Sequence, residues 1–322
     1  MSSGTGQTVP TGLKPPYPPT TAPLGGVPTT AIDIPISGTL LGVFALAAAA
    51  HMFLFLRNNR RRHKFVFSVL LFGFCMTRIA ALALRITWAR DRANANLALA
   101  ATVLTSAGVL ILFIVNIILA IRVVRATHPL VGWARPVGWA FKVLIATVVA
   151  VLVMVVVCSV HQMFTLDLET RRMERDVMLF AGVYMTVVAV VPLVVMVLVK
   201  LLPRKGPYPA ESFGKGSTGA KVALLAFTST LLALGAGFRT AVNFEAKPVN
   251  DPQWYHSRAA FYGFNFAIEI VVVYTYLIVR FDQRFYVPDG SSKPGDYSKA
   301  GGSVPGWWAG SADSEVACTS YD

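Results

Sequence analysis

The chain has 322 residues, of which 55% are hydrophobic and only 14% are charged. An ordinary soluble domain carries charge on about a quarter of its residues, so this composition excludes one. The net charge of +13 would suggest nucleic acid as a partner of a soluble protein. Here the basic residues lie between hydrophobic blocks, where they set membrane topology, and we expect no nucleic-acid partner.

Composition divides the chain into three parts. Residues 1–34 are rich in Pro, Thr and Gly and carry almost no charge, which predicts a disordered tail. Residues 35–290 hold the apolar blocks and form the predicted membrane domain. Residues 291–322 are rich in Gly and Ser and predict a second disordered tail.

The apolar blocks are each close to the roughly 20 residues that a helix needs to cross a bilayer. They predict an all-α integral membrane protein with a bundle of seven transmembrane helices. Short alternating strands of the kind found in a membrane barrel do not occur in the sequence. The predicted spans are residues 35–56, 65–88, 97–121, 139–160, 177–201, 222–242 and 258–280.

Loop charges predict the orientation. The segment 57–64 (RNNRRRHK) holds five Lys and Arg and no acid, and the predicted inner segments together hold 18 of the 29 basic residues. By the positive-inside rule, the N-terminus lies outside and the C-terminus inside. We expect the first span to act as the targeting signal and the protein to be a multi-pass protein of the plasma membrane.

The last span contains a single acid, Glu269, within otherwise apolar sequence. At about 100° per residue, the polar side chains of this span fall on one face, which must meet protein or water. The opposite face is aliphatic and aromatic, as lipid requires. The residues on the polar face are Arg258, Tyr262, Asn265, Glu269 and Tyr276.

Arg78 in the second span is the predicted partner of Glu269. At 1.5 Å per residue, Arg78 lies about 21 Å from residue 64 and Glu269 about 17 Å from residue 280, so their depths agree. An unpaired charge at this depth is costly, which predicts an ion pair with Asn265 and Tyr262 filling spare hydrogen bonds. Asn116 in the third span is assigned to the same polar core. Either this core clamps the helices, or it lines a ligand cavity and changes partner when a ligand or proton arrives.

A second predicted group, the outer basic cluster, consists of Arg85, Arg239 and Arg258. It could bind the acidic part of an amphiphile, or it could anchor helix ends by snorkelling. We also expect membrane lipids as partners, with anionic headgroups at the basic inner loops, and a small amphiphilic ligand. Protein partners are left open.

Motifs of enzymes and metal sites are missing from the sequence. The five histidines are scattered without HxxxH or HExxH spacing, and no GxSxG run or glycine-rich phosphate loop occurs. Paired cysteines at metal-ligand spacing are also absent. We therefore expect no enzyme, no catalytic residue, no cofactor and no metal.

Several runs carry a family resemblance. The sequences GFRTAVNFE, WYHSRAAFYGFNFAIEI and VRFDQRFYVPDG, with KFVFSVLLFGFCMTRIAALALRITWA earlier, resemble an uncharacterised fungal seven-helix family, a domain of unknown function, over residues 35–290. The chain is more distantly similar to the fungal RTA-like lipid-translocating exporters, whose corresponding region also has an Arg, a nearby Glu and an FY-type helix. The matching positions are Arg239, Glu245, Phe261 and Tyr262, although Glu269 and the spacing of Arg239 to Glu245 depart from that pattern.

Three functions remain open at this stage. The RTA-like resemblance implies the handling or export of lipid or another amphiphile. A receptor-like sensor also fits seven helices with an outer N-terminus, although the third span is followed by IRVVR rather than the common Asp/Glu-Arg-Tyr motif. The third function is a structural membrane protein.

Overall fold

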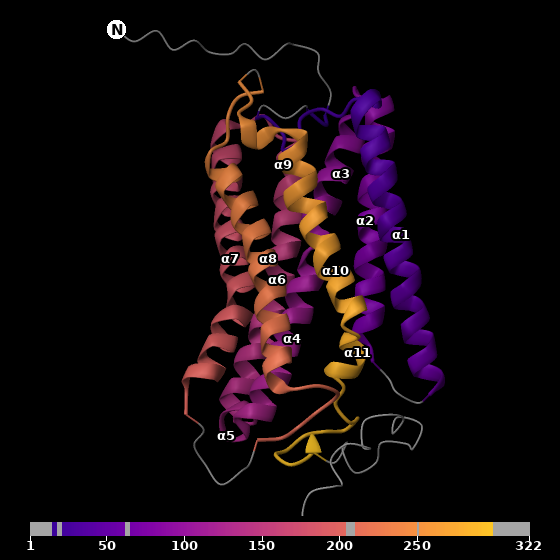
Figure 1. Ribbon diagram of the computed structural model, residues 1–322. Helices are drawn as coiled ribbons and strands as arrows, with labels where there is room; N and C mark the ends of the chain where they lie inside the picture. The colour runs from indigo at the N-terminus through magenta and orange to yellow at the C-terminus, as the bar shows by residue number, and fades with distance from the viewer. Residues whose placement is uncertain (1–14, 18–20, 62–64, 204–209, 250, 299–322) are drawn as a thin grey trace, which may run out of the picture.

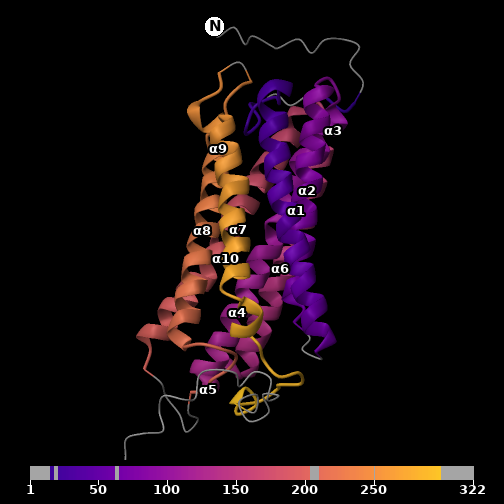
Figure 2. The same cartoon turned by 45° about the vertical axis from the view of Figure 1, so that its right-hand side comes forward.

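The computed structural model describes residues 15–17, 21–61, 65–203, 210–249 and 251–298. Within these residues, seven helical spans are long and apolar enough to cross a membrane. They stand side by side in one elongated bundle (Figure 1, and turned by 45° in Figure 2). The predicted class, an all-α integral membrane protein with seven spans, is confirmed, whereas the orientation of the termini stays a prediction.

Two of the seven spans are assembled from more than one helical segment, and short helices lie between or beyond the spans. The spans are α1 (Thr30–Arg60), α2 (Phe67–Arg90), α3 followed by α4 (Ala95–Gly108 and Leu110–Thr127), α6 (Arg135–His161), α7 (Leu168–Leu201), α8 (Thr218–Phe244), and α9 with η2 and α10 (Arg258–Tyr262, Gly263–Ala267 and Ile268–Ile278). The short helices are α5 (Pro129–Gly132), η1 (Trp254–His256) and α11 (Phe281–Arg284).

Local sequence explains where the spans start and stop. Asn94 caps α3 by accepting from two backbone N–H groups, and Asp167 caps α7 by accepting from the backbone of Thr170. The third span breaks after Gly108, and the seventh contains a π-helical segment, η2. Arg280, with φ of 52°, ends the seventh span in the left-handed conformation, so that α11 turns away.

The bundle has two ends, which we name after the short helices found there. The α9 end, at the top of Figure 1, carries the start of α1, and the α11 end carries α5 and α11. Helix α1 packs mainly against α2, and α7 packs mainly against α8. Helix α6 is the most peripheral span, since only 6% of its most apolar stretch is buried inside the bundle.

The chain before α1 is ordered where it is described. Helix α1 begins at Thr30, and the Ala22 N–H donates to the Lys247 carbonyl at 2.8 Å. The predicted disordered tail is therefore wrong for residues 21–34, because backbone pairing, a buried ion pair of Asp33 and the packing of Leu24 against the core hold them in place. Residues 1–14 and 18–20 of that predicted tail lie outside the described residues.

The start of the predicted C-terminal tail is also folded. The carboxylate of Glu211 accepts from the backbone N–H groups of Gly295 and Tyr297, each at 2.8 Å. The Tyr297 ring packs edge-on against Trp133, with the ring centres 5.5 Å apart. The prediction of disorder is wrong for residues 291–298, because Glu211 gathers their backbone donors, and residues 299–322 lie outside the described part.

Candidate ligand site in the bundle

The predicted ion pair between Arg78 of α2 and Glu269 of α10 is present in the bundle interior. The Arg78 Nη2 lies 2.5 Å from the Glu269 Oε1, and both side chains are at most 1% exposed. Arg78 Nη1 also donates to the backbone carbonyl of Thr105 at 2.6 Å. The guanidinium therefore joins the second, third and seventh spans.

A break in the third span makes room for this guanidinium. A Cβ at Gly108 would lie 3.2 Å from the Cζ of Arg78 and 2.7 Å from the hydroxyl oxygen of Thr77, so only glycine fits without displacement. After the break, the Val109 N–H points to Ala107 rather than continuing the α-helical ladder. The Thr105 carbonyl is thereby released from its usual i+4 donor and accepts from Arg78 instead.

Only part of the hydrogen-bonding capacity of the Arg78–Glu269 pair is used. Within the described residues, the Glu269 Oε2 and the Arg78 Nε have no hydrogen-bond partner. The phenyl rings of Phe74 and Phe266 lie 5.2 and 5.6 Å from the Arg78 guanidinium carbon and supply cation–π contacts. A buried carboxylate oxygen without a donor is unusual and is free to receive one.

Asn265 and Tyr262 do not form hydrogen bonds with these two unpaired atoms. The prediction that they complete the hydrogen bonding of the Arg78–Glu269 pair is therefore wrong. Asn265 donates to the Phe261 carbonyl at 3.0 Å and accepts from the Arg239 Nη1 at 3.3 Å. The Tyr262 hydroxyl belongs to a separate group around Asp33. Both side chains face the protein interior as expected, but at other depths of the bundle.

Arg239 of α8 lies next to the Arg78–Glu269 pair rather than with Arg85 and Arg258. It is attracted electrostatically to Glu269 and repelled by Arg78. Its Nη1 lies 3.8 Å from the position a Cβ of Gly235 would occupy, so this glycine leaves space beside the seventh span. The prediction that Arg239 belongs to the outer basic cluster is therefore wrong, because the thin face of α8 lets its side chain reach inward.

A cavity of about 200 Å³ opens between α3, α4, α6, α7 and α8, with Arg239 on its wall. Ala107 and Val109, on either side of Gly108, also line it, so the cavity borders the Arg78–Glu269 pair without including it. Most of the wall is apolar. The polar members of the lining are Thr102, Ser106, Ser159, Arg239, Thr240 and Asn243.

Asn116 is buried but takes no part in this cavity. It donates to Thr228 at 3.3 Å and to Ser229 at 3.0 Å, and it accepts from the Tyr276 hydroxyl. Its amide thus joins α4, α8 and α10 through a network in which every polar group has a partner. Asn116 therefore belongs to the buried polar core, to which the sequence analysis assigned it, and it does not line this cavity.

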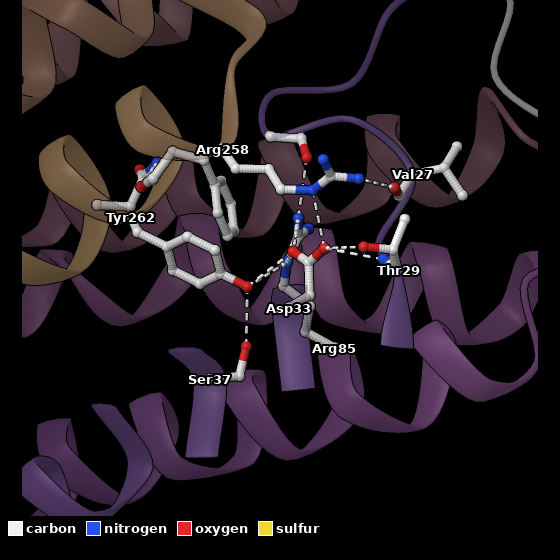
Figure 3. A network of polar contacts seen from close by, with 10 residues as sticks. Val27, Thr29, Asp33, Ser37, Arg85, Arg258 and Tyr262 are labelled. Atoms are coloured by element: carbon white, nitrogen blue, oxygen red, sulfur yellow. Dashed lines mark hydrogen bonds and ion pairs between the residues drawn. The ribbon is translucent and has the colours of Figure 1, made fainter. Parts of the chain in front are cut away.

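A second ion cluster lies at the α9 end and is centred on Asp33 of α1 (Figure 3). The Asp33 Oδ1 accepts from Arg85 Nη2 and from the Tyr262 hydroxyl, each at 2.8 Å. The Oδ2 accepts from Arg258 Nε at 2.9 Å and from the Thr29 N–H at 2.8 Å. The structure therefore brings Arg85 and Arg258 together, as predicted, but around an acid that the sequence analysis missed.

The Asp33 cluster extends into the loop before α1. Arg85 Nη2 donates to the Gly25 carbonyl at 3.0 Å, and Ser37 shares a hydrogen bond of 2.9 Å with Tyr262. Gly25 has φ of 81°, and a Cβ there would lie 2.6 Å from the Phe261 ring, so only glycine fits. An acid four residues after Thr29 at the start of an apolar run is a helix-start signal that could have identified Asp33.

No metal site accompanies these charges: among the described residues, no three His, Cys, Asp and Glu side chains gather as metal ligands would. The two ion clusters differ in how completely their atoms are paired. The Asp33 cluster joins α1, α2 and the start of the seventh span, whereas the Arg78–Glu269 pair borders a cavity.

A family model described as a protein of unknown function (DUF3112) matches residues 210–286. The match runs from before α8 through α11 and includes Arg239, Tyr262, Asn265 and Glu269. The predicted resemblance to an uncharacterised family is confirmed over these residues, while its fungal origin and the RTA-like similarity stay predictions. No curated protein matches the chain, and no solved structure does.

Proposed function

We propose that this multi-pass membrane protein binds an amphiphile with an anionic headgroup and carries it across or out of the membrane. The observation that supports this proposal is the apolar cavity with Arg239 on its wall. Apolar side chains suit an acyl chain, and a guanidinium binds a carboxylate or phosphate through paired hydrogen bonds. The distribution of basic residues supports an N-terminus outside, and the plasma membrane is the location that we propose.

Arg239 has the hydrogen-bonding capacity that such a ligand needs. A guanidinium carries five N–H donors, and the hydrogen bond of Arg239 found in the described residues is the 3.3 Å contact to Asn265. Glu269 lies close enough to attract it but is bonded to Arg78. An incoming anion would therefore meet a partly buried cation, and the nearby carboxylate of Glu269 is already bonded to Arg78.

Helix α6 supports a route for the ligand from the bilayer. It contributes Leu152, Val155 and Val156 to the cavity wall, and Val148 is the residue of this helix that is buried. A helix packed this loosely can move aside at little cost in buried apolar area. The acyl chain would enter between α6 and its neighbours while the headgroup follows toward Arg239.

A sensor is the second candidate function, and the π-helical segment η2 favours it. This segment joins Asn265, which contacts Arg239, to Glu269 in the next turn. A π-helical turn contains one residue more than an α-helical turn and often marks a functional position. A ligand at Arg239 could change the register of η2, and α10 would carry that change to the α11 end. A purely structural role is the third candidate and would leave the cavity without a ligand.

The experiment is a transfer assay in proteoliposomes. A short-chain fluorescent phosphatidic acid and the matching phosphatidylcholine would be followed by quenching of the label in the outer leaflet. We expect faster transfer of the anionic lipid with the wild-type protein and loss of this gain in Arg239→Gln. Arg92→Gln, which alters an exposed arginine at the same end of the bundle, is the matched control and should behave as wild type.

The outcomes separate the candidates. Folded wild-type protein that transfers neither lipid would overturn the transport proposal. If the anionic lipid binds in an Arg239-dependent way but is not transferred, the sensor is favoured. Absence of both binding and transfer would leave the structural role.

A further inference from the structure

A second and larger cavity, of about 380 Å³, lies at the α11 end of the bundle. It is bounded by α4, by α6, by the segment 287–291 and by Tyr297, and it lies nearer the α11 end of α4 than the cavity of Arg239 does. One part of its wall is aliphatic and aromatic, with Ile121 and Phe141. The basic residues on the wall are Arg122, Arg125 and Lys142.

Carbonyls, aromatic rings and the Tyr297 hydroxyl hold these three cations, and Asp289 attracts Arg122 without forming an ion pair with it. Arg122 Nη1 donates to the Phe285 carbonyl at 2.7 Å, and Arg125 lies 4.5 Å over the Trp133 ring. The Lys142 ammonium lies 5.4 Å from the centre of the Trp139 ring. None of the ion pairs in the described part of the chain includes them, and Asp289 is the acid on the lining. The wall therefore keeps an excess of positive charge.

The position of α6 places this cavity at the edge of the membrane. Trp139 is 66% exposed and lies in the first turns of the lipid-facing helix, a position typical of tryptophan at the boundary between acyl chains and headgroups. Lys142 follows one turn further along the same helix. The cations are thus at headgroup depth, and the apolar wall formed with Ile145 continues toward the acyl region.

We propose that this cavity binds the phosphate-bearing headgroup of an anionic phospholipid in the leaflet at the α11 end. Arg122 and Arg125 offer fixed donors from α4, and Lys142 adds a mobile charge from α6. The lipid would bridge α4, α6 and the segment 287–291 and hold this end of the bundle together. The site is separate from Arg239 and does not depend on transport.

The test uses the full chain in nanodiscs of phosphatidylcholine with a minor fraction of phosphatidic acid. Native mass spectrometry would count the anionic lipids that remain bound to the wild type and to Lys142→Gln, Arg125→Gln and Lys142→Arg. Loss of one charge-assisted contact is expected to weaken retention by about tenfold in the two Gln variants. Lys142→Arg should retain the lipid, and so should Lys200→Gln, which changes an exposed lysine at the end of α7.

A thermal melt of each variant would show that it is folded. Competition with inorganic phosphate and with a soluble phosphorylated headgroup distinguishes a lipid site from a free-anion site. The proposal is supported if the lipid is retained in the presence of millimolar phosphate. It is overturned if phosphate alone displaces the lipid, if phosphatidylcholine is retained equally, or if both Gln variants match the wild type. A negative result would not bear on the function proposed for the Arg239 cavity, because the two cavities share no lining residue.

Discussion

Two buried carboxylates, Asp33 and Glu269, each pair with an arginine of α2, and the two arginines lie seven residues apart on that helix. Their surroundings differ. Both oxygens of Asp33 receive donors from two arginines, a tyrosine and the backbone. Glu269 has one oxygen to which none of the described residues donates, and a second arginine, Arg239, lies nearby.

This difference in hydrogen bonding distinguishes a structural clamp at Asp33 from a site at Glu269 whose partners can change. A saturated buried ion cluster loses much when any partner leaves, so it fixes one arrangement of the helices. A half-paired acid beside a cavity has room for a new donor and lies close to a cation that a ligand can reach. Asp33 thus fixes α1, α2 and the seventh span against one another at the α9 end, and Glu269 lies where we propose that partners can change.

Removal of Asp33 is expected to have the largest effect. Asp33→Ala leaves Arg85 and Arg258 without their shared counter-ion, and breaking a buried pair costs about 3–5 kcal/mol. Thermal unfolding of the detergent-solubilised protein would measure the loss. A variant as stable as the wild type would contradict the clamp, and Asp91→Ala, an exposed acid at the same end, serves as the control.

Glu269→Gln is expected to have a smaller effect on stability. Glutamine keeps an oxygen that can accept from Arg78, so the loss is that of a charge-assisted hydrogen bond, about 1.5–3 kcal/mol. The same unfolding assay applies. A loss larger than that of Asp33→Ala would reverse the proposed ranking of the two clusters.

Gly108→Ala tests the close approach of Arg78 to the third span. The added methyl group would displace the guanidinium or Thr77, at a cost of about 1–3 kcal/mol. Gly73→Ala on α2 gives the same gain in helix propensity, but its Cβ would meet nothing within 4 Å. We expect Gly73→Ala to be neutral or slightly stabilising, and equal effects at both positions would refute the packing argument.

The smallest expected effect on stability is a pH dependence that arises from His256 at the α9 end. Burial lowers the pKa of His256 in η1, and its Nδ1 accepts from the Gln253 N–H, which requires the neutral ring. The unfolded chain takes up the proton near the ordinary pKa of about 6.5, so stability is full above that pH and falls as the pH drops below it. Melting temperatures at pH 7.5 and 5.5 should differ less in His256→Gln than in the wild type. An unchanged difference would exclude His256 as the cause.

The spans and the Arg78–Glu269 pair were predictable because both follow from length and depth. Apolar blocks of bilayer length leave few alternatives to helices, and 1.5 Å per residue fixes the depth of a charge within a helix. Charges at equal depth in a low-dielectric interior seek one another. Composition did not predict the role of Asp33. An average over residues 1–34 does not single out one acid, and the partners of that acid come from spans that are distant in the sequence.

The partners along the seventh span could not be read from its periodicity. Successive residues of its polar face contact different partners. Tyr262 bonds to Asp33, Asn265 to Arg239 and Glu269 to Arg78. Further along the span, Tyr276 bonds to Asn116 of α4. The π-helical segment η2 breaks the 3.6-residue period between Asn265 and its neighbours, and sequence gives no sign of it. Which helix approaches each position depends on packing, and the thin face at Gly235 brought Arg239 inward.

The most direct measurement of the central claim is photo-crosslinking of a long-chain fatty acid that carries a diazirine, with its methyl ester as the uncharged control. Labelled peptides of the wild-type protein in nanodiscs would be mapped by mass spectrometry. Our account predicts labelling of the α6 wall around Leu152 and Val156 by the acid, with a loss of about tenfold in Arg239→Gln and none in Arg92→Gln. Equal labelling by acid and ester, or labelling that survives in Arg239→Gln, would contradict it.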